Sequence, residues 1–99
     1  MPGLTAQTAA YIRAAGGSCR GITKIMLYGS RARGCERPGS DIDLAVFGDL
    51  TQPDIWKLSG LLNDEIPSPY TFDLIHFDRT NNEQLKQDIL NDGIIVYER

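Results

Sequence analysis

The sequence is short and has few of the features that mark secreted, membrane or zinc-binding proteins. Its 99 residues include two cysteines, Cys19 and Cys35, which are too few for a disulfide framework and too far apart for a zinc cluster. No apolar run approaches the ~20 residues that a membrane span requires, and the first twenty residues lack the apolar stretch of a signal peptide. We therefore expect a reduced, cytoplasmic protein without a membrane segment.

The sequence also has fewer basic than acidic residues. The chain has 10 Lys and Arg residues against 13 Asp and Glu residues, which argues against direct nucleic-acid binding, because binding by charge needs a basic surface. Residues 1–37 carry six basic groups and one acid, whereas residues 38–99 carry four basic groups and twelve acids. This asymmetry suggests an anion site that faces a carboxylate site, although an accident of surface composition would give the same count.

Helix and strand patterns alternate to the end of the chain. They predict helices over residues 5–15, 53–66 and 82–91, and strands over residues 24–28, 41–47, 70–77 and 94–97. Glycines 16 and 17 are expected to stop the first helix, and Pro53 to take the first helical position of the second. Three side chains of the last helix are expected to face inward, namely Leu85, Ile89 and Leu90. Without a repeat or linker, residues 1–99 are predicted to form one domain of the α/β (α+β) class.

The first candidate site lies where the strand at 24–28 meets a predicted helix start at Ser30. Gly29 ends the strand and Ser30 is a candidate helix cap, so the Ser30 hydroxyl and the first free N–H groups point to one spot. The helix dipole favours an anion there, and the guanidinium groups of Arg31 and Arg33 suit phosphate oxygens. The pattern predicts a phosphate-binding turn, while a Gly-Ser pair also occurs in turns without such a function.

Two carboxylates follow a predicted turn at residues 37–40. Asp41 and Asp43 are two residues apart in a predicted strand, so both side chains emerge on one face while Ile42 and Leu44 enter the core. Neighbouring carboxylates repel unless a cation lies between them, and oxygen ligands beside a phosphate site suit Mg²⁺. A solvated pair of acids at a strand entrance is the alternative interpretation.

A third acid, Asp73, interrupts the apolar strand at 70–77. A lone carboxylate is costly to bury unless it is paired, metal-bound or facing water. A neighbouring strand that carries Asp41 and Asp43 would provide the partner through a shared metal ion. The three acids beside an anion site are a more specific signal than any one of them alone.

These motifs resemble a known family. Gly29-Ser30, followed after ten residues by Asp41-Ile42-Asp43 and then by a strand-borne Asp73, is similar to the signature of the nucleotidyltransferase superfamily that includes DNA polymerase β and kanamycin nucleotidyltransferase. The segments 29–34 (GSRARG) and 40–44 (SDIDL) are closer still to the minimal nucleotidyltransferases, the MNT proteins of prokaryotes. The resemblance covers nearly the whole chain.

The resemblance implies a nucleotidyltransferase fold, with a small mixed β-sheet flanked by helices, and transfer of AMP from ATP with two Mg²⁺ ions. Asp41 and Asp43 would hold one ion, which binds the triphosphate together with Gly29 and Ser30. Asp73 would share the second ion, which lowers the pKa of the attacking hydroxyl. The charges of Arg31 and Arg33 would help to neutralise the leaving pyrophosphate. The choice of ATP rests on the family, since the sequence offers no purine pocket.

The resemblance also implies a partner, an all-helical HEPN-type toxin in a hetero-oligomeric complex. The expected function is that of the antitoxin of a HEPN–MNT toxin–antitoxin pair, which adenylylates a hydroxyl of this protein. The alternatives are a non-catalytic antitoxin that blocks its toxin by binding, and nucleotidyl transfer to a small-molecule acceptor. Outside the motifs, we expect His76 to be a hydrogen-bonded strand residue and Trp56 a core or partner contact.

Overall fold

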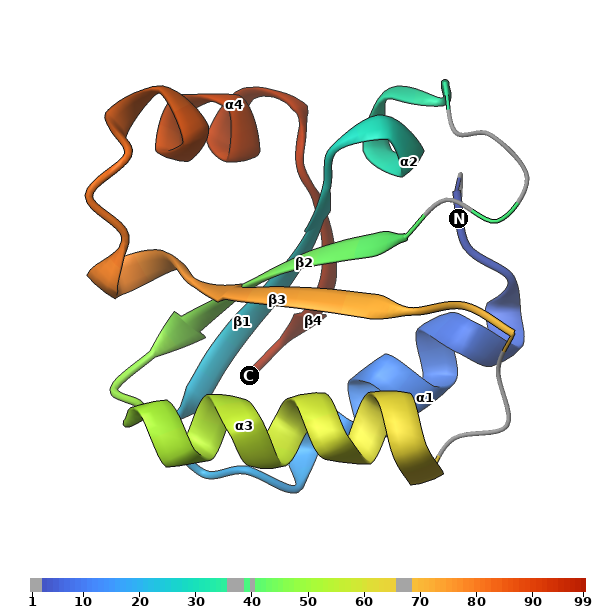
Figure 1. Ribbon diagram of the computed structural model, residues 1–99, viewed down its shortest axis with the longest axis vertical. Coiled ribbons are helices and arrows are strands. Elements are labelled where there is room, and N and C mark those ends of the chain that lie inside the picture. Colours follow the sequence, from blue (N-terminus) through green and yellow to red (C-terminus); the bar gives the residue numbers. More distant parts are fainter. Residues whose placement is uncertain (1–2, 36–38, 40, 66–68) are drawn as a thin grey trace.

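Four strands form one mixed sheet in the computed structural model, which describes residues 3–35, 39, 41–65 and 69–99. The strands are β1 (Ile22–Tyr28), β2 (Ile42–Gly48), β3 (Phe72–His76) and β4 (Ile94–Glu98), in the order β3-β2-β1-β4 (Figure 1). β2 pairs with β1 antiparallel and with β3 parallel, and β4 pairs with β1 antiparallel. The predicted fold class, a small mixed sheet flanked by helices, is confirmed.

Side-chain caps set the starts of the three longer helices, α1 (Ala6–Gly17), α3 (Gln52–Gly60) and α4 (Glu83–Asp92). The caps are Thr5, Thr51 and Asn82, and each side chain accepts a bond from an N–H of the first turn, where the helix itself offers no partner. Because Thr51 is the cap of α3, Pro53 takes the second helical position. The prediction that Pro53 takes the first position is therefore wrong.

The glycine pair at positions 16 and 17 marks the end of α1, but both glycines belong to the helix, which therefore extends two residues beyond the predicted end at residue 15. A Cβ atom at Gly16 would lie 3.0 Å from side-chain atoms of Ile25 and Tyr97. The absence of a side chain therefore lets the last turn of α1 approach the sheet closely, and Ser18, directly after the pair, is the C-cap.

Another correction concerns α4, whose predicted inward residues included Leu90. Ile89 is fully buried and Leu85 is half-buried, but Leu90 is 57% exposed. A short helix that lies on a sheet touches it along a narrow stripe, and the residue after Ile89 points about 100° away from that stripe. Leu90 therefore faces solvent.

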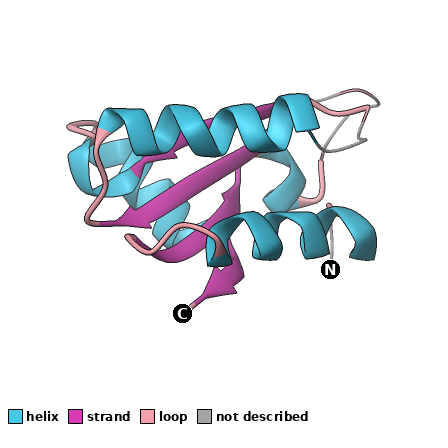
Figure 2. Ribbon diagram, turned by 90° about the horizontal axis from the view of Figure 1, so that it is seen from below, coloured by secondary structure: helices cyan, strands magenta, loops and turns pink. Residues whose placement is uncertain are grey.

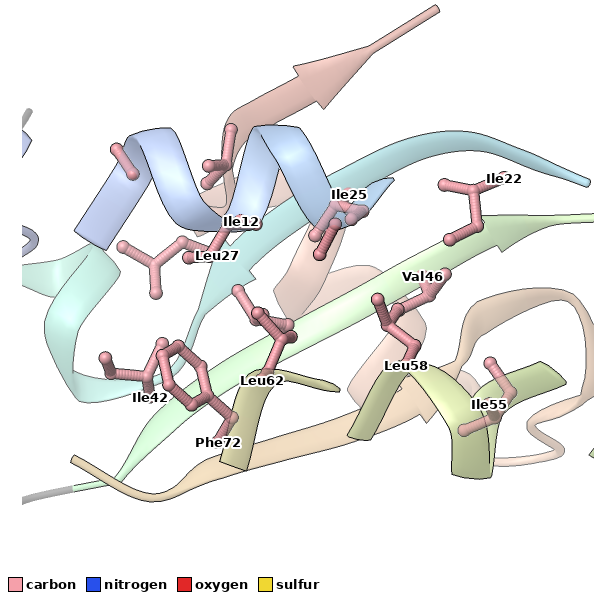
Figure 3. Close-up of a cluster of buried hydrophobic side chains, with 14 of the residues drawn as sticks. Ile12, Ile22, Ile25, Leu27, Ile42, Val46, Ile55, Leu58, Leu62 and Phe72 are labelled. Carbon is pink, nitrogen blue, oxygen red and sulfur yellow. The ribbon is translucent and has the colours of Figure 1, made fainter. Parts of the chain in front are cut away.

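The two faces of the sheet are covered unequally. α1 and α3 lie on one face (Figures 1 and 2), where they build the main core with all four strands. Its fully buried residues include Ile12, Leu27, Ile42 and Leu62 (Figure 3). α4 lies on the other face and forms a smaller cluster with Met26, Ala45 and Ile89. We call the first the covered face and the second the open face.

Some predicted boundaries differ or fall outside the described residues. α3 ends at Gly60 and continues into a π-helical turn, Leu61–Glu65, whereas Ile66 lies outside the described residues. The predicted turn at residues 37–40 also lies outside them, apart from Gly39. β3 is shorter than predicted, since residues 77–79 form a 3₁₀ turn. Among the helices of the described ranges, none combines the length and the apolarity needed to cross a membrane.

Candidate active site at the edge of the open face

Asp43 lies in the middle of a row of three polar side chains that runs across the sheet. Its register partner on β1 is Tyr28, and its register partner on β3 is Asp73. Residues in register on neighbouring strands point to the same face of a sheet, and for this row it is the open face, since Tyr28 packs against the cluster beneath α4. The structure thus brings together the two carboxylates that the sequence places 30 residues apart.

This row concentrates negative charge. Burial raises the pKa of the Asp43 carboxyl, the charges of Asp73 and then Asp41 add to that rise, and the Arg31 charge opposes it. Burial, followed by the charges of Asp43 and Asp73, raises the pKa of Tyr28 to about 12. Like charges at such close range favour either a proton or a cation between them. The site therefore has the electrostatics of a cation site.

Asp41 lies immediately before β2 and is exposed. The residue between the two acids, Ile42, is fully buried on the covered face, and its N–H donates to the Thr71 carbonyl at 2.9 Å. This alternation sends Asp41 and Asp43 to the side opposite Ile42, as the sequence predicted. The bond to Thr71 also ties the start of β2 to the segment that leads into β3.

Asn63 fixes the start of β3. Its side chain accepts a bond from the Phe72 N–H at 2.7 Å and donates to the Phe72 carbonyl at 3.1 Å. Phe72 immediately precedes Asp73, so this amide pairs with the edge strand as a neighbouring strand would. Asn63 lies in the π-helical turn after α3, and the sequence carries no signal for this role.

The turn after β1 approaches the Asp43 carboxylate closely. Gly29 has φ +78°, and a Cβ atom there would lie 2.5 Å from Asp43 Oδ2. Gly29, not Ser30, takes the cap position of α2 (Ser30–Arg33), and no side chain of the described residues caps this helix, so the predicted role of Ser30 as cap is wrong. α2 has a single turn, which leaves the Ser30 hydroxyl and the first N–H groups of the helix as the candidate phosphate ligands.

The two predicted phosphate-binding arginines differ in their surroundings. Arg33 is exposed, whereas Arg31 is 7% exposed. The Arg31 guanidinium donates to the backbone carbonyls of Gly3 and Asp41 and lies over the ring of Tyr70. Arg33 is therefore oriented toward solvent, whereas Arg31 is buried and hydrogen-bonded to the main chain.

The carboxylates fit a magnesium ion if substrate oxygens complete its coordination. Within the described ranges, no three His, Cys, Asp or Glu side chains are placed to bind one ion by themselves. Mg²⁺ usually keeps several waters and takes one or two carboxylates together with substrate phosphates. Asp41, Asp43 and Asp73 offer only oxygen ligands and lie beside a candidate phosphate turn, which is the donor chemistry that Mg²⁺ prefers.

Comparison with known proteins identifies the family of the chain. Residues 17–99 match the family described as polymerase beta, nucleotidyltransferase. The chain belongs to this family. No curated protein matches the chain significantly. The match begins within α1 and includes all four strands, so the nucleotidyltransferase domain contains every candidate site residue named above.

Solved structures share the fold of this nucleotidyltransferase. A toxin–antitoxin complex with AMP-PNP has a chain that is 21% identical, with a TM-score of 0.73 over 97% of this chain and 75% of that one. A complex of a tri-AMPylated Shewanella oneidensis HEPN toxin with its MNT antitoxin gives 20% identity and a TM-score of 0.71 over 94% and 71% of the two chains. A candidate minimal nucleotidyltransferase is 26% identical, with a TM-score of 0.67 over 89% and 91%.

Of the residues outside the predicted site, His76 and Trp56 were interpreted from the sequence. His76 is half-buried and its Nε2 lies 2.8 Å from the carbonyl of Gly48, so its ring links the last residues of β2 and β3. The expectation of a hydrogen-bonded strand residue is confirmed at Nε2, whereas Nδ1 is buried and has no partner among the described residues. Trp56 is 66% exposed on α3, which rules out the core among the two interpretations offered for it.

Proposed function

We propose that this protein, with residues 1–99 as a single minimal nucleotidyltransferase domain, transfers AMP from ATP to a hydroxyl of a protein partner in a Mg²⁺-dependent reaction. The partner is a HEPN-type toxin with which it forms a hetero-oligomeric complex, so the protein acts as the antitoxin. Two free cysteines, Cys19 and Cys35, suit the reduced, cytoplasmic setting that such a pair requires.

One observation carries the chemical part of the proposal. Asp43 and Asp73 are register partners on adjacent parallel strands, and Gly29 lets the α2 turn come close to the Asp43 carboxylate. Carboxylates and a phosphate-binding turn are thereby brought to one place on the open face. A metal–triphosphate complex is small, so the carboxylates that bind the metal and the turn that binds the phosphates have to lie close together.

The chemistry divides the residues by role. The acceptor oxygen forms a bond with the α-phosphorus of ATP, the bond from that phosphorus to the bridging oxygen breaks, and pyrophosphate leaves. Gly29 and Ser30 hold the β- and γ-phosphates, and Arg33 adds positive charge beside the leaving group. Asp73, exposed on an edge strand, takes the proton of the acceptor hydroxyl.

Metal ions complete the site in this proposal. Asp41 and Asp43 would hold one Mg²⁺ ion and Asp73 would share a second, and the ions would neutralise charge on the triphosphate and lower the pKa of the attacking hydroxyl. The raised pKa of the Asp43 carboxyl supports this role, because a cation relieves the repulsion that causes part of the rise.

The position of the acids favours a macromolecular acceptor. Small-molecule sites are usually concave and enclose most of their ligand, whereas Asp41 and Asp73 are exposed at one end of the open face. A hydroxyl on the surface of a folded partner can reach such a site. The solved complexes of similar chains, one with AMP-PNP and one with a tri-AMPylated HEPN toxin, support ATP as donor and this class of partner.

The experiment replaces Asp73 with asparagine and follows the mass of the co-expressed toxin. If Asp73 acts on the acceptor, Asp73→Asn binds Mg·ATP but adds no nucleotide to the toxin, and cells lose protection. Asp78→Asn, an exposed aspartate in the turn after β3, is the matched control and should modify the toxin fully. Full protection by Asp73→Asn with an unmodified toxin would show that the protein is a non-catalytic antitoxin.

A further inference from the structure

Arg31 is the buried cation beside the candidate site. Its side chain is 7% exposed, and Nη1 donates to the Gly3 carbonyl at 3.0 Å while Nε donates to the Asp41 carbonyl at 3.3 Å. The guanidinium carbon lies 4.5 Å from the centroid of the Tyr70 ring. A planar cation with bonds in its own plane and a ring against its face uses the features that distinguish arginine from lysine.

These contacts join three segments that are distant in sequence. Gly3 lies in the segment before α1, Asp41 is the residue before β2, and Tyr70 lies in the segment before β3. The segments before β2 and β3 are already linked by the bond from the Ile42 N–H to the Thr71 carbonyl. Arg31 belongs to α2, so its guanidinium connects the candidate phosphate-binding turn with the starts of β2 and β3.

Asp41 depends on this junction more than Asp43 does. Asp43 is held by register partners on both sides, in β1 and in β3. Asp41 precedes the strand, and its carbonyl accepts the bond from Arg31 Nε. The Arg31 contact therefore orients the main chain from which the Asp41 carboxylate projects.

We propose that Arg31 is a positioning residue that holds Asp41 for metal binding, and that it does not bind the triphosphate itself. This inference rests on the proposed function, because it assigns Asp41 to a metal ion. A phosphate ligand has to present its N–H groups to solvent, as exposed Arg33 can, whereas Arg31 directs Nε and Nη1 to backbone carbonyls beneath the surface.

The test compares Arg31→Lys with Arg33→Ala in the full chain, using Mn²⁺ alone as the metal probe. Lysine keeps the charge but has neither the Nε–H nor the planar face, so Arg31→Lys should weaken Mn²⁺ binding about 10-fold and lower kcat about 10-fold, with the KM for ATP nearly unchanged. Arg33→Ala should raise the KM for ATP and leave Mn²⁺ affinity as it is. Arg13→Ala, on an exposed position of α1, is the control for both measurements.

The opposite division of effects would overturn the inference. If Arg31→Lys binds Mn²⁺ like the wild type and raises the KM for ATP as Arg33→Ala does, Arg31 is a phosphate ligand. A wild type that binds Mn²⁺ but transfers no nucleotide would contradict the proposed function, while the Mn²⁺ measurement would still decide the role of Arg31. A wild type that binds no Mn²⁺ would remove both proposals.

A second variant keeps the test sharp if Arg31→Lys does not fold. Gly3 has φ +80°, and a Cβ atom there would collide with the Arg31 carbonyl, so Gly3→Ala displaces the segment that Arg31 holds without touching a predicted ligand. We expect Gly3→Ala to weaken Mn²⁺ binding about 3-fold, since it disturbs the junction indirectly. Unchanged Mn²⁺ affinity in a folded Gly3→Ala protein would contradict a positioning role for this junction.

Discussion

The covered and open faces of the sheet differ in how much apolar surface they bury. On the covered face, two helices and all four strands close a continuous core, whereas on the open face α4 shields only a small cluster around Met26, Ala45 and Ile89. The contrast appears along a single strand, where Leu27 is fully buried and the next residue, Tyr28, is half-buried beside two carboxylates.

This difference shows how a chain of 99 residues accommodates a charged site. A small domain cannot enclose acids in its interior, because an unpaired buried carboxylate costs more than a small core supplies. Here one face provides the stability, and the other keeps the acids at an edge where water, metal or substrate can reach them. We therefore expect substitutions on the open face to affect activity and those on the covered face to affect folding.

The largest expected effect is the loss of activity in Asp43→Asn. The neutral amide removes a central metal ligand, and we expect kcat/KM for nucleotide transfer to fall by at least about 10³-fold, or about 4 kcal/mol of barrier. Folding should persist, as circular dichroism can verify. Asp49→Asn, an exposed aspartate beyond the other end of β2, is the matched control, and wild-type transfer by Asp43→Asn would refute the assignment of the site.

The next effect is on stability, and it compares two leucines. Leu44 is fully buried on the covered face, while Leu85 is half-buried beside the cluster on the open face. Leu44→Ala should lower the free energy of unfolding by about 2–5 kcal/mol, and Leu85→Ala by about 1 kcal/mol. Urea denaturation measures both values. Equal losses would mean that the open face is packed as tightly as the covered one.

A third prediction concerns Gly29, where the backbone conformation and the site meet. Alanine at φ +78° is strained, and its Cβ atom would press on the Asp43 carboxylate. We expect Gly29→Ala to lower the free energy of unfolding by about 1–3 kcal/mol and to reduce transfer as well. Gly34→Ala is the control, because Gly34 also has a positive φ but has nothing within 4 Å of an added Cβ atom. It should lose stability only, and equal losses of activity in both would contradict the contact with Asp43.

Much of this contrast could be predicted from the sequence because local patterns encode it. The alternation of Asp41, Ile42 and Asp43 assigns the acids and the apolar residue to opposite faces. Gly29 was identified from its place between a strand and a helix start. Such features depend on residues that are near one another in the chain.

Several features that depend on tertiary packing were not predicted. The burial of Arg31 depends on Gly3 and Tyr70, which are 28 residues before it and 39 residues after it. The pairing of Asn63 with Phe72 needs a π-helical turn, which has no sequence signature. Gly16 and Leu90 were misassigned because a glycine can serve close packing as well as a helix end, and a leucine can face solvent without cost to the fold.

The smallest expected effect is a pH-dependent change in thermal stability at Asp43. Its pKa is raised in the folded protein from the usual 3.8, so the folded state binds this proton more tightly than the unfolded chain does. The resulting stabilisation is present below pH 3.8 and is lost as the pH rises through the raised pKa. The asparagine of Asp43→Asn does not titrate. As the pH rises over this range, the Tm of Asp43→Asn should therefore increase relative to that of the wild type. Because Asp43 is partly exposed, we expect an increase of only about 1–4 °C.

Millimolar Mg²⁺ should remove this increase by stabilising the wild type alone, and Asp49→Asn should show neither effect. A Tm difference that stays constant from pH 3 to pH 7, as measured by differential scanning calorimetry, would show that repulsion among the acids is negligible without the metal.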